Sequence, residues 1–199
     1  IVQTSSGQSR PWHKIVSTIP LPQLLNLLSE CPPRLQELAS ELEAVSLKIL
    51  MLLIKPASDS LPQRVYISDP EIPAHKVAFN HTSSPSLRAR DHHAVMCEVS
   101  YSPFKPSASD DKLLKTMSKW LLDAHYIDNE KDVIETRVID VPFGYPVNTP
   151  SKVTIVSEIH SYLNDLGIYS IGRFGAWDYA NSDECIRQGL DLADKLHIG

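Results

Sequence analysis

The sequence lacks the features that mark several large protein classes. It contains no run of lysine and arginine: 19 basic and 24 acidic side chains give a formal net charge of −5 over 199 residues. A nucleic-acid partner is therefore not expected. The longest apolar run, Ile49–Ile54, has six residues, whereas a membrane-spanning helix needs about 20. Residues 1–16 also lack the apolar segment of a signal peptide.

Cysteine is scarce and widely spaced. The three cysteines, Cys31, Cys97 and Cys185, form no CxxC pair, which excludes a zinc knuckle and a thioredoxin-like motif. An odd number of distant cysteines indicates reduced thiols and predicts a cytoplasmic location. The adjacent His92 and His93 would point to opposite faces of a strand, so no metal site is expected.

Sequence motifs of self-contained catalysts are missing as well. The chain has no GxSxG, HExxH, P-loop or GxGxxG sequence, so its catalytic residues stay unknown. It also opens on Ile1 rather than methionine, from which we expect a fragment of a longer protein.

Hydrophobic periodicity predicts a mixed α/β (α+β) fold. The short strands are separated by turn-forming sequences such as Asp69-Pro70-Glu71-Ile72-Pro73, which favours an antiparallel sheet with flanking helices. Thr149 is predicted to cap a helix that has Pro150 at its first position and ends at Gly167. Strands are expected at 14–19, 47–54 (fully buried), 64–68, 76–80, 94–100, 134–141 and 168–171. Helices are expected at 21–28, 34–45, 113–124 and 150–166, and the polar residues 181–183 are expected to open a last helix.

The segment after the last predicted strand has the composition of an anion site. Gly172 and Gly175 allow close approach to the backbone, and the fork of Arg173 suits two phosphate oxygens. The alternative is an ordinary turn with a surface arginine. Tyr145 and Tyr179 lie in polar loops, where each hydroxyl is suited either to a phosphate or sugar contact or to ordinary half-burial.

Two motifs carry a family resemblance. Gly144-Tyr145-Pro146-Val147-Asn148-Thr149, and later Gly167-Ile168-Tyr169-Ser170-Ile171-Gly172-Arg173-Phe174-Gly175-Ala176-Trp177-Asp178-Tyr179, resemble the C-terminal region of FAD-dependent flavoproteins of the amine-oxidase and protoporphyrinogen-oxidase-like superfamily. Within that group they are most similar to UDP-galactopyranose mutases. Softer similarity at 16–21, 65–70, 72–77 and 98–102 extends the resemblance over nearly the whole chain.

The resemblance implies a substrate-binding sheet together with the C-terminal strand and helix of a Rossmann-like FAD domain. Its implied domains are 1–30, joining the FAD domain; 31–142, binding substrate; and 143–199, the C-terminal FAD-domain segment. The implied cofactor is FAD, and the implied partner is a small-molecule substrate such as a nucleotide sugar. The implied substrate-binding residues are Arg173, Tyr145, Tyr179 and Lys76, and the implied flavin-facing residues are Gly172, Asn181, Ser182 and Asp183.

The sequence departs from the family pattern at three positions. Lys76 stands where the family has a second diphosphate-binding arginine, and lysine lacks the bidentate fork. Ile171 replaces an arginine, and Ser182 replaces a glutamine. The absence of the Rossmann glycines predicts weak or no FAD binding by this chain.

Two hypotheses follow from these residues. One is that the parent is a flavoenzyme acting on a sugar nucleotide or a small oxidisable substrate. The other is a non-catalytic module that binds a ligand or a partner. Under either hypothesis, the first strand and last helix are expected to expose apolar surface and favour self-association.

Overall fold

The computed structural model describes residues 1–196, which divide into two compact units. Unit 1 comprises residues 1–44 and 145–199, and unit 2 comprises residues 45–144. The chain passes between them twice, in strands β4 (Ala44–Ile54) and β8 (Val133–Pro146). The expected boundary near residue 30 differs from the observed division, because helix α2 (Pro33–Ser40) packs on α1 (Leu21–Asn26) and α5 (Lys152–Asp165) inside unit 1.

Unit 2 is built on a five-stranded sheet with the order β5-β6-β7-β4-β8. Its inner strands pair antiparallel, so the predicted antiparallel sheet with flanking helices is confirmed. The remaining strands of the sheet are β5 (Arg64–Tyr66), β6 (Lys76–Phe79) and β7 (His93–Tyr101). The short helical segments of the unit are η1 (Asn80–Ser83), α3 (Pro85–Arg88) and η2 (Glu130–Asp132).

Strand β4 shows how alternation defines the core of unit 2. Leu50, Leu52 and Ile54 are fully buried, whereas the residues between them are half-buried. In the antiparallel register Leu50 lies opposite Cys97 and Leu52 opposite Val95, which places these side chains on the same face. The prediction of a strand buried on both faces was wrong, because one face of this sheet is more open than the other.

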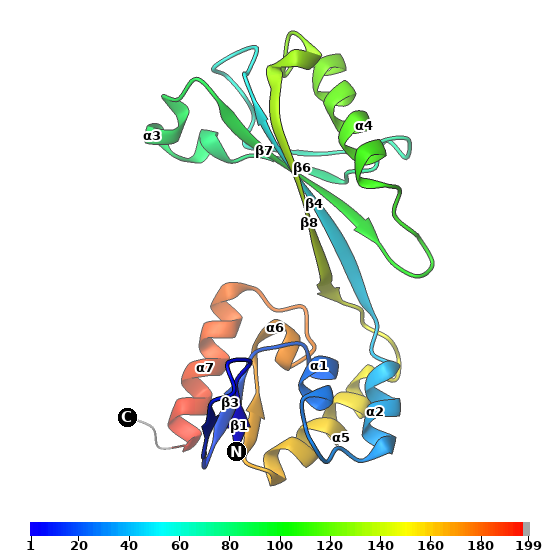
Figure 1. The fold of residues 1–199 in the computed structure, drawn as a ribbon, viewed down its shortest axis with the longest axis vertical. Helices are drawn as coiled ribbons and strands as arrows, with labels where there is room; N and C mark the ends of the chain where they lie inside the picture. The colour runs from blue at the N-terminus through cyan, green and yellow to red at the C-terminus, as the bar shows by residue number, and fades with distance from the viewer. Residues whose placement is uncertain (197–199) are drawn as a thin grey trace. The chain divides into compact units, whose positions relative to one another are not determined.

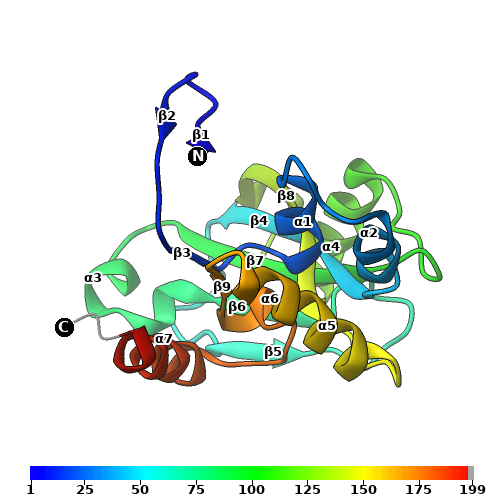
Figure 2. The same cartoon turned by 90° about the horizontal axis from the view of Figure 1, so that it is seen from below.

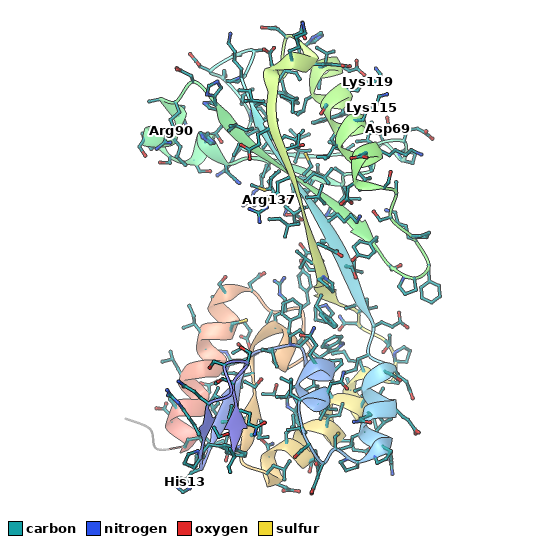
Figure 3. The ribbon with its side chains drawn as sticks, in the orientation of Figure 1. His13, Asp69, Arg90, Lys115, Lys119 and Arg137 are labelled. Carbon is teal, nitrogen blue, oxygen red and sulfur yellow. The ribbon has the colours of Figure 1, made fainter. Side chains whose placement is uncertain are left out.

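Helix α4 (Asp110–Asp123) contributes to the core of unit 2 (Figure 1). Leu113, Met117 and Leu121 recur at helical spacing and are buried in the same cluster as the alternate residues of β4. Lys115 and Lys119 project away from the sheet (Figure 3). The helix is therefore amphipathic, as its sequence predicted.

Unit 1 is organised around two parallel strands, β3 (Ile15–Ser17) and β9 (Ile168–Ser170). Helices α1, α2 and α5 lie on one side of this pair, and α7 (Ser182–Leu196) lies on the other (Figures 1 and 2). Helix α5 buries Ile155, Ile159 and Leu163. Gly167, at a φ of 76°, ends that helix and connects it directly to β9, as predicted.

Several local features differ from the prediction. Helix α5 begins at Lys152 without a side-chain cap, because Thr149 accepts the Lys152 N–H in a turn that precedes the helix. A short helix, α6 (Gly172–Gly175), follows β9 where a loop was expected. A small hairpin, β1 (Val2–Gln3) with β2 (Ser9–Arg10), was not predicted. Among residues 1–196 no helix combines the length and apolarity needed to cross a membrane.

Candidate functional site

Arg173 lies in the first turn of α6, immediately after β9. Ile171 before it is extended, and its N–H donates to the Ser17 carbonyl at 2.9 Å, so the end of β9 stays tied to β3. Gly172 has a φ of 77°, in the left-handed region that glycine adopts without strain. The arginine Nε–H donates to the Ala180 carbonyl at 2.7 Å. One edge of the guanidinium is thereby fixed to the backbone.

Two tyrosine rings flank this guanidinium. Its Cζ atom lies 5.5 Å from the centroid of the Tyr145 ring and 5.0 Å from that of Tyr179, both within the range of a cation–π contact. The two rings stack on each other, with centroids 5.6 Å apart and an interplanar angle of 28°. We call Arg173, Tyr145 and Tyr179 the clamp. The structure thus brings together three of the four residues predicted to bind substrate.

The clamp arginine has no carboxylate partner within residues 1–196. Since its Nε–H is bound to a carbonyl, the two terminal nitrogens form the edge that remains for a ligand. That edge matches two oxygens of a phosphate or carboxylate. Tyr179 is exposed and Arg173 is half-buried, so the clamp lies at the surface of unit 1.

A lysine that the sequence reasoning missed lies beside the clamp. The Lys152 ammonium donates to Asn148 Oδ1 and to Asp178 Oδ1, each at 2.8 Å. The bond from Lys152 holds the pKa of the Asp178 carboxyl below its usual range. Asp178 stands within the recognised motif, but no sequence pattern links it to a lysine 26 residues earlier.

The segment predicted to face a flavin forms the entrance to α7. Ser182 and Asp183 begin the helix, and the Asn181 carbonyl accepts the Cys185 N–H at 3.0 Å. The Gly172 N–H donates to the Gln188 side chain at 2.7 Å, which ties α6 to α7. A Cβ atom built at Gly172 would meet no other atom within 4 Å. Open space of this kind allows a flat ring to approach the backbone.

Binding of FAD requires more than open space beside Gly172. Its pyrophosphate is normally bound by a glycine-rich turn and an uncovered helix N-terminus, whereas the first turn of α7 carries Asp183 and Glu184. Within residues 1–196 the fit to the cofactor is therefore partial. Gly172 suits contact with the ring system, and the acidic turn disfavours the phosphates.

Lys76, the fourth predicted substrate residue, lies in unit 2. It pairs with Glu98, which stands directly opposite on β7, at a distance of 2.5 Å. The Glu98 side chain is only 7% exposed, and His75 Nε2 lies 3.6 Å from its second oxygen. The charge of Lys76 is thus compensated by a buried carboxylate.

Trp177, immediately before Asp178, is fully buried. No group of three or more metal-ligating side chains occurs within the described part of the chain.

Comparisons with known proteins place the fold. No family model matches the chain. The structure is similar to a reduced UDP-galactopyranose mutase, with a TM-score of 0.85 and 21% identity over 99% of this chain and 44% of the mutase. It is also similar to a protein described as a protoporphyrinogen oxidase from Exiguobacterium, with a TM-score of 0.67 and 17% identity over 93% of this chain and 41% of that one. A putrescine oxidase matches with a TM-score of 0.64 and 14% identity, over 92% of this chain and 42% of its own.

These similarities concern the fold. The resemblance to amine-oxidase and protoporphyrinogen-oxidase-like proteins that was drawn from the sequence is confirmed at that level. The chain spans less than half the length of each of these proteins.

Proposed function

We propose that this chain is the substrate-binding part of a FAD-dependent enzyme whose substrate carries a diphosphate or a similar anion. A sugar nucleotide, as in UDP-galactopyranose mutase, fits this description, and a small oxidisable substrate with an anionic group is the broader class. The observation that supports it is the clamp: a guanidinium without a carboxylate partner in residues 1–196, flanked by two tyrosines. The protein would act in the cytoplasm, consistent with its three free thiols.

The clamp residues have distinct tasks in this proposal. Arg173 binds two anion oxygens through its terminal nitrogens. The rings of Tyr145 and Tyr179 hold the guanidinium plane in place, and the hydroxyl group of the exposed Tyr179 can donate a hydrogen bond to a further oxygen. The arrangement fixes the anionic end of a substrate without taking part in bond breaking. A bound flavin would supply the redox or nucleophilic chemistry.

The rest of a FAD domain would pack on an apolar surface of unit 1. A shallow hollow there is lined by Val16, Ile171, Gly189, Leu192, Ala193 and Leu196. Val16, on strand β3 of the two-stranded parallel sheet, is 50% exposed, whereas parallel sheets are normally larger and buried on both faces. We infer that unit 1, residues 1–44 and 145–199, belongs to such a domain and that unit 2, residues 45–144, is the substrate domain.

Calorimetry with inorganic pyrophosphate and with UDP tests the clamp. Arg173→Ala should abolish binding, and Arg173→Lys should retain only a small part of it because lysine lacks the fork. Arg137→Ala, which removes an exposed arginine on β8 (Figure 3), should bind as the unaltered chain does. Equal affinity of Arg173→Ala and the unaltered chain would reject the anion role.

A non-catalytic binding module is the second candidate function. The Lys76–Glu98 pair favours it, because a lysine committed to a buried carboxylate is a weaker second phosphate ligand. The two candidates differ in the complete protein. A flavoenzyme should purify yellow, with flavin absorbance that persists through gel filtration, whereas a module should stay colourless after FAD is added.

A further inference from the structure

One ammonium group links the segment that follows Tyr145 to the turn that contains Tyr179. Lys152 Nζ donates to Asn148 in the loop after β8 and to Asp178 in the turn after α6, at 2.8 Å each. Its side chain is only 12% exposed, although Asp178 itself is 61% exposed. A lysine held in this way has lost most of its rotamer freedom, which a surface lysine ordinarily keeps.

Both ends of this link lie next to clamp residues. Asn148 follows Tyr145 by three positions, and Asp178 directly precedes Tyr179. The Asp178 N–H also donates to the Arg173 carbonyl at 2.9 Å. Lys152 is therefore linked to Tyr145 through three residues of chain, to Tyr179 through its neighbour Asp178, and to Arg173 through the Asp178 N–H bond.

The turn that Lys152 holds through Asp178 has a strained backbone. Trp177, immediately before Asp178, has a φ of 51°, in the left-handed region that non-glycine residues rarely occupy. A strained position persists where its surroundings hold it. The burial of the tryptophan ring and the ion pair of its neighbour supply two such restraints.

Charge gives the lysine a second effect. Asp178 places a carboxylate in the turn that carries Arg173, and this carboxylate would repel an anionic ligand. Lys152 neutralises it locally, as the lowered pKa of Asp178 reflects. Since opposing charges near a site alter affinity for a charged ligand, an uncompensated Asp178 should weaken anion binding.

We propose that Lys152 is a positioning residue that holds the Tyr145–Tyr179 stack and neutralises Asp178 beside the anion site. The positional part concerns the clamp itself, and the charge part rests on the proposed function. Lys152 touches neither substrate nor cofactor in this assignment. It acts through its bonds to Asn148 and Asp178.

The positional part is tested without ligand. Fluorine NMR of the fluorotyrosine-labelled chain, with resonances assigned from Tyr145→Phe and Tyr179→Phe, reports the stacking of the two rings. Lys152→Met should shift both resonances towards those of exposed tyrosine, and Lys152→Arg should restore them. Lys14→Met removes an exposed lysine of the same unit and should leave them unchanged. Unshifted resonances in folded Lys152→Met would overturn this part.

The charge part is tested with inorganic pyrophosphate by calorimetry. Lys152→Met should weaken binding by about tenfold, because it loosens the clamp and exposes an uncompensated carboxylate. Adding Asp178→Asn to that variant should recover part of the loss, which a purely structural role would not allow. Equal affinities of the single and double variants would overturn the charge role.

The two proposals fail in different ways. If the unaltered chain binds no pyrophosphate, the anion function fails, while the fluorine spectra still decide whether Lys152 orders the rings. If pyrophosphate binds and Arg173→Ala abolishes binding, but Lys152→Met changes neither the spectra nor the affinity, the clamp stands and the positioning role is lost.

Discussion

The Cζ atom of Arg173, in helix α6, lies 5.0 Å from the centroid of the Tyr179 ring, in the turn after that helix. The tyrosine is 59% exposed, so burial of the ring does not explain its position. Its position is explained by its contacts with the Arg173 guanidinium and with the Tyr145 ring. This relationship makes the aromatic ring of Tyr179, rather than its hydroxyl alone, a testable part of the anion site.

Two substitutions of Tyr179 should distinguish the contribution of its ring to pyrophosphate binding from that of its hydroxyl group. Tyr179→Phe keeps the stack and the cation–π contact, and should weaken pyrophosphate binding only by the loss of one hydrogen bond, about 1 kcal/mol. Tyr179→Ala also removes the ring and should cost about 1 kcal/mol more. Calorimetry measures both. If the two variants bound equally well, the ring would have no part in orienting the arginine.

Glycine substitutions at two positions should have opposite effects on stability. A Cβ atom at Gly175 would lie 2.8 Å from Ser170 Oγ and 3.1 Å from the Ser17 carbonyl, so Gly175→Ala should destabilise the fold by about 1–3 kcal/mol. Gly189 lies within α7, and a Cβ atom there would meet no other atom within 4 Å.

Gly189→Ala should therefore stabilise the chain by up to about 1 kcal/mol, through helix propensity. Urea unfolding of both variants beside the unaltered chain gives the two changes in midpoint. A neutral Gly175→Ala would mean that α6 does not pack as closely on β9 as these distances indicate, and a destabilising Gly189→Ala would mean that the space beside Gly189 is occupied.

The sequence predicted the order of the main elements and the three residues that form the clamp. These rest on local patterns: hydrophobic periodicity for the helices and strands, and a glycine–arginine–aromatic motif for the site. The pairing of Lys76 with Glu98 was beyond such reasoning, because it depends on which residue of β7 lies opposite β6. A single register step would have placed a different side chain there.

The Lys152–Asp178 bond was unpredictable for a related reason. Its two residues lie on separate elements, α5 and the turn after α6, and only the packing of unit 1 brings them together. The same limit applies to the helix start at Lys152. Thr149 and Pro150 form a plausible cap sequence, but the observed turn uses the Thr149 carbonyl instead of its hydroxyl.

Unit 2 should lose stability in acid through His81. Its ring stacks on that of His93 with centroids 4.7 Å apart, and both side chains are buried. Its Nδ1 accepts the Ala94 N–H at 2.9 Å, which requires that nitrogen to be unprotonated. Burial, then the neighbouring His93 and Arg90, lower the pKa of His81 below the ordinary value of 6.5.

The unfolded chain therefore takes up a proton at His81 before the folded chain does. Stability should be fully present above pH 6.5 and should decline as the pH falls towards the lowered folded-state pKa. His81→Gln keeps an acceptor for the Ala94 N–H but cannot titrate, so it should flatten this decline. Urea unfolding midpoints measured between about pH 8 and 5 give this dependence on pH. The control is His92→Gln, which replaces an exposed histidine and should leave the decline unchanged. If it flattened the decline as much as His81→Gln does, His81 would not be its source.

The apolar face of α7 should drive self-association of the chain. Ile186 and Leu190 are 64% and 63% exposed and stand one helical turn apart, beside the hollow defined above. Contiguous apolar surface of this kind marks an interaction site. We expect the sedimentation coefficient to rise with concentration, and Ile186→Glu combined with Leu190→Lys to abolish the rise.

The matched control for this experiment is Leu27→Glu, which removes an exposed leucine at the end of α1. Isolated exposed leucines are normal on protein surfaces and carry little association energy, so this variant should associate as the unaltered chain does. The double variant should remain monomeric because burial of these two charged side chains in a contact between copies would remove their hydration. A concentration-independent monomer for the unaltered chain would mean that the hollow and the exposed side of α7 do not act as a contact surface.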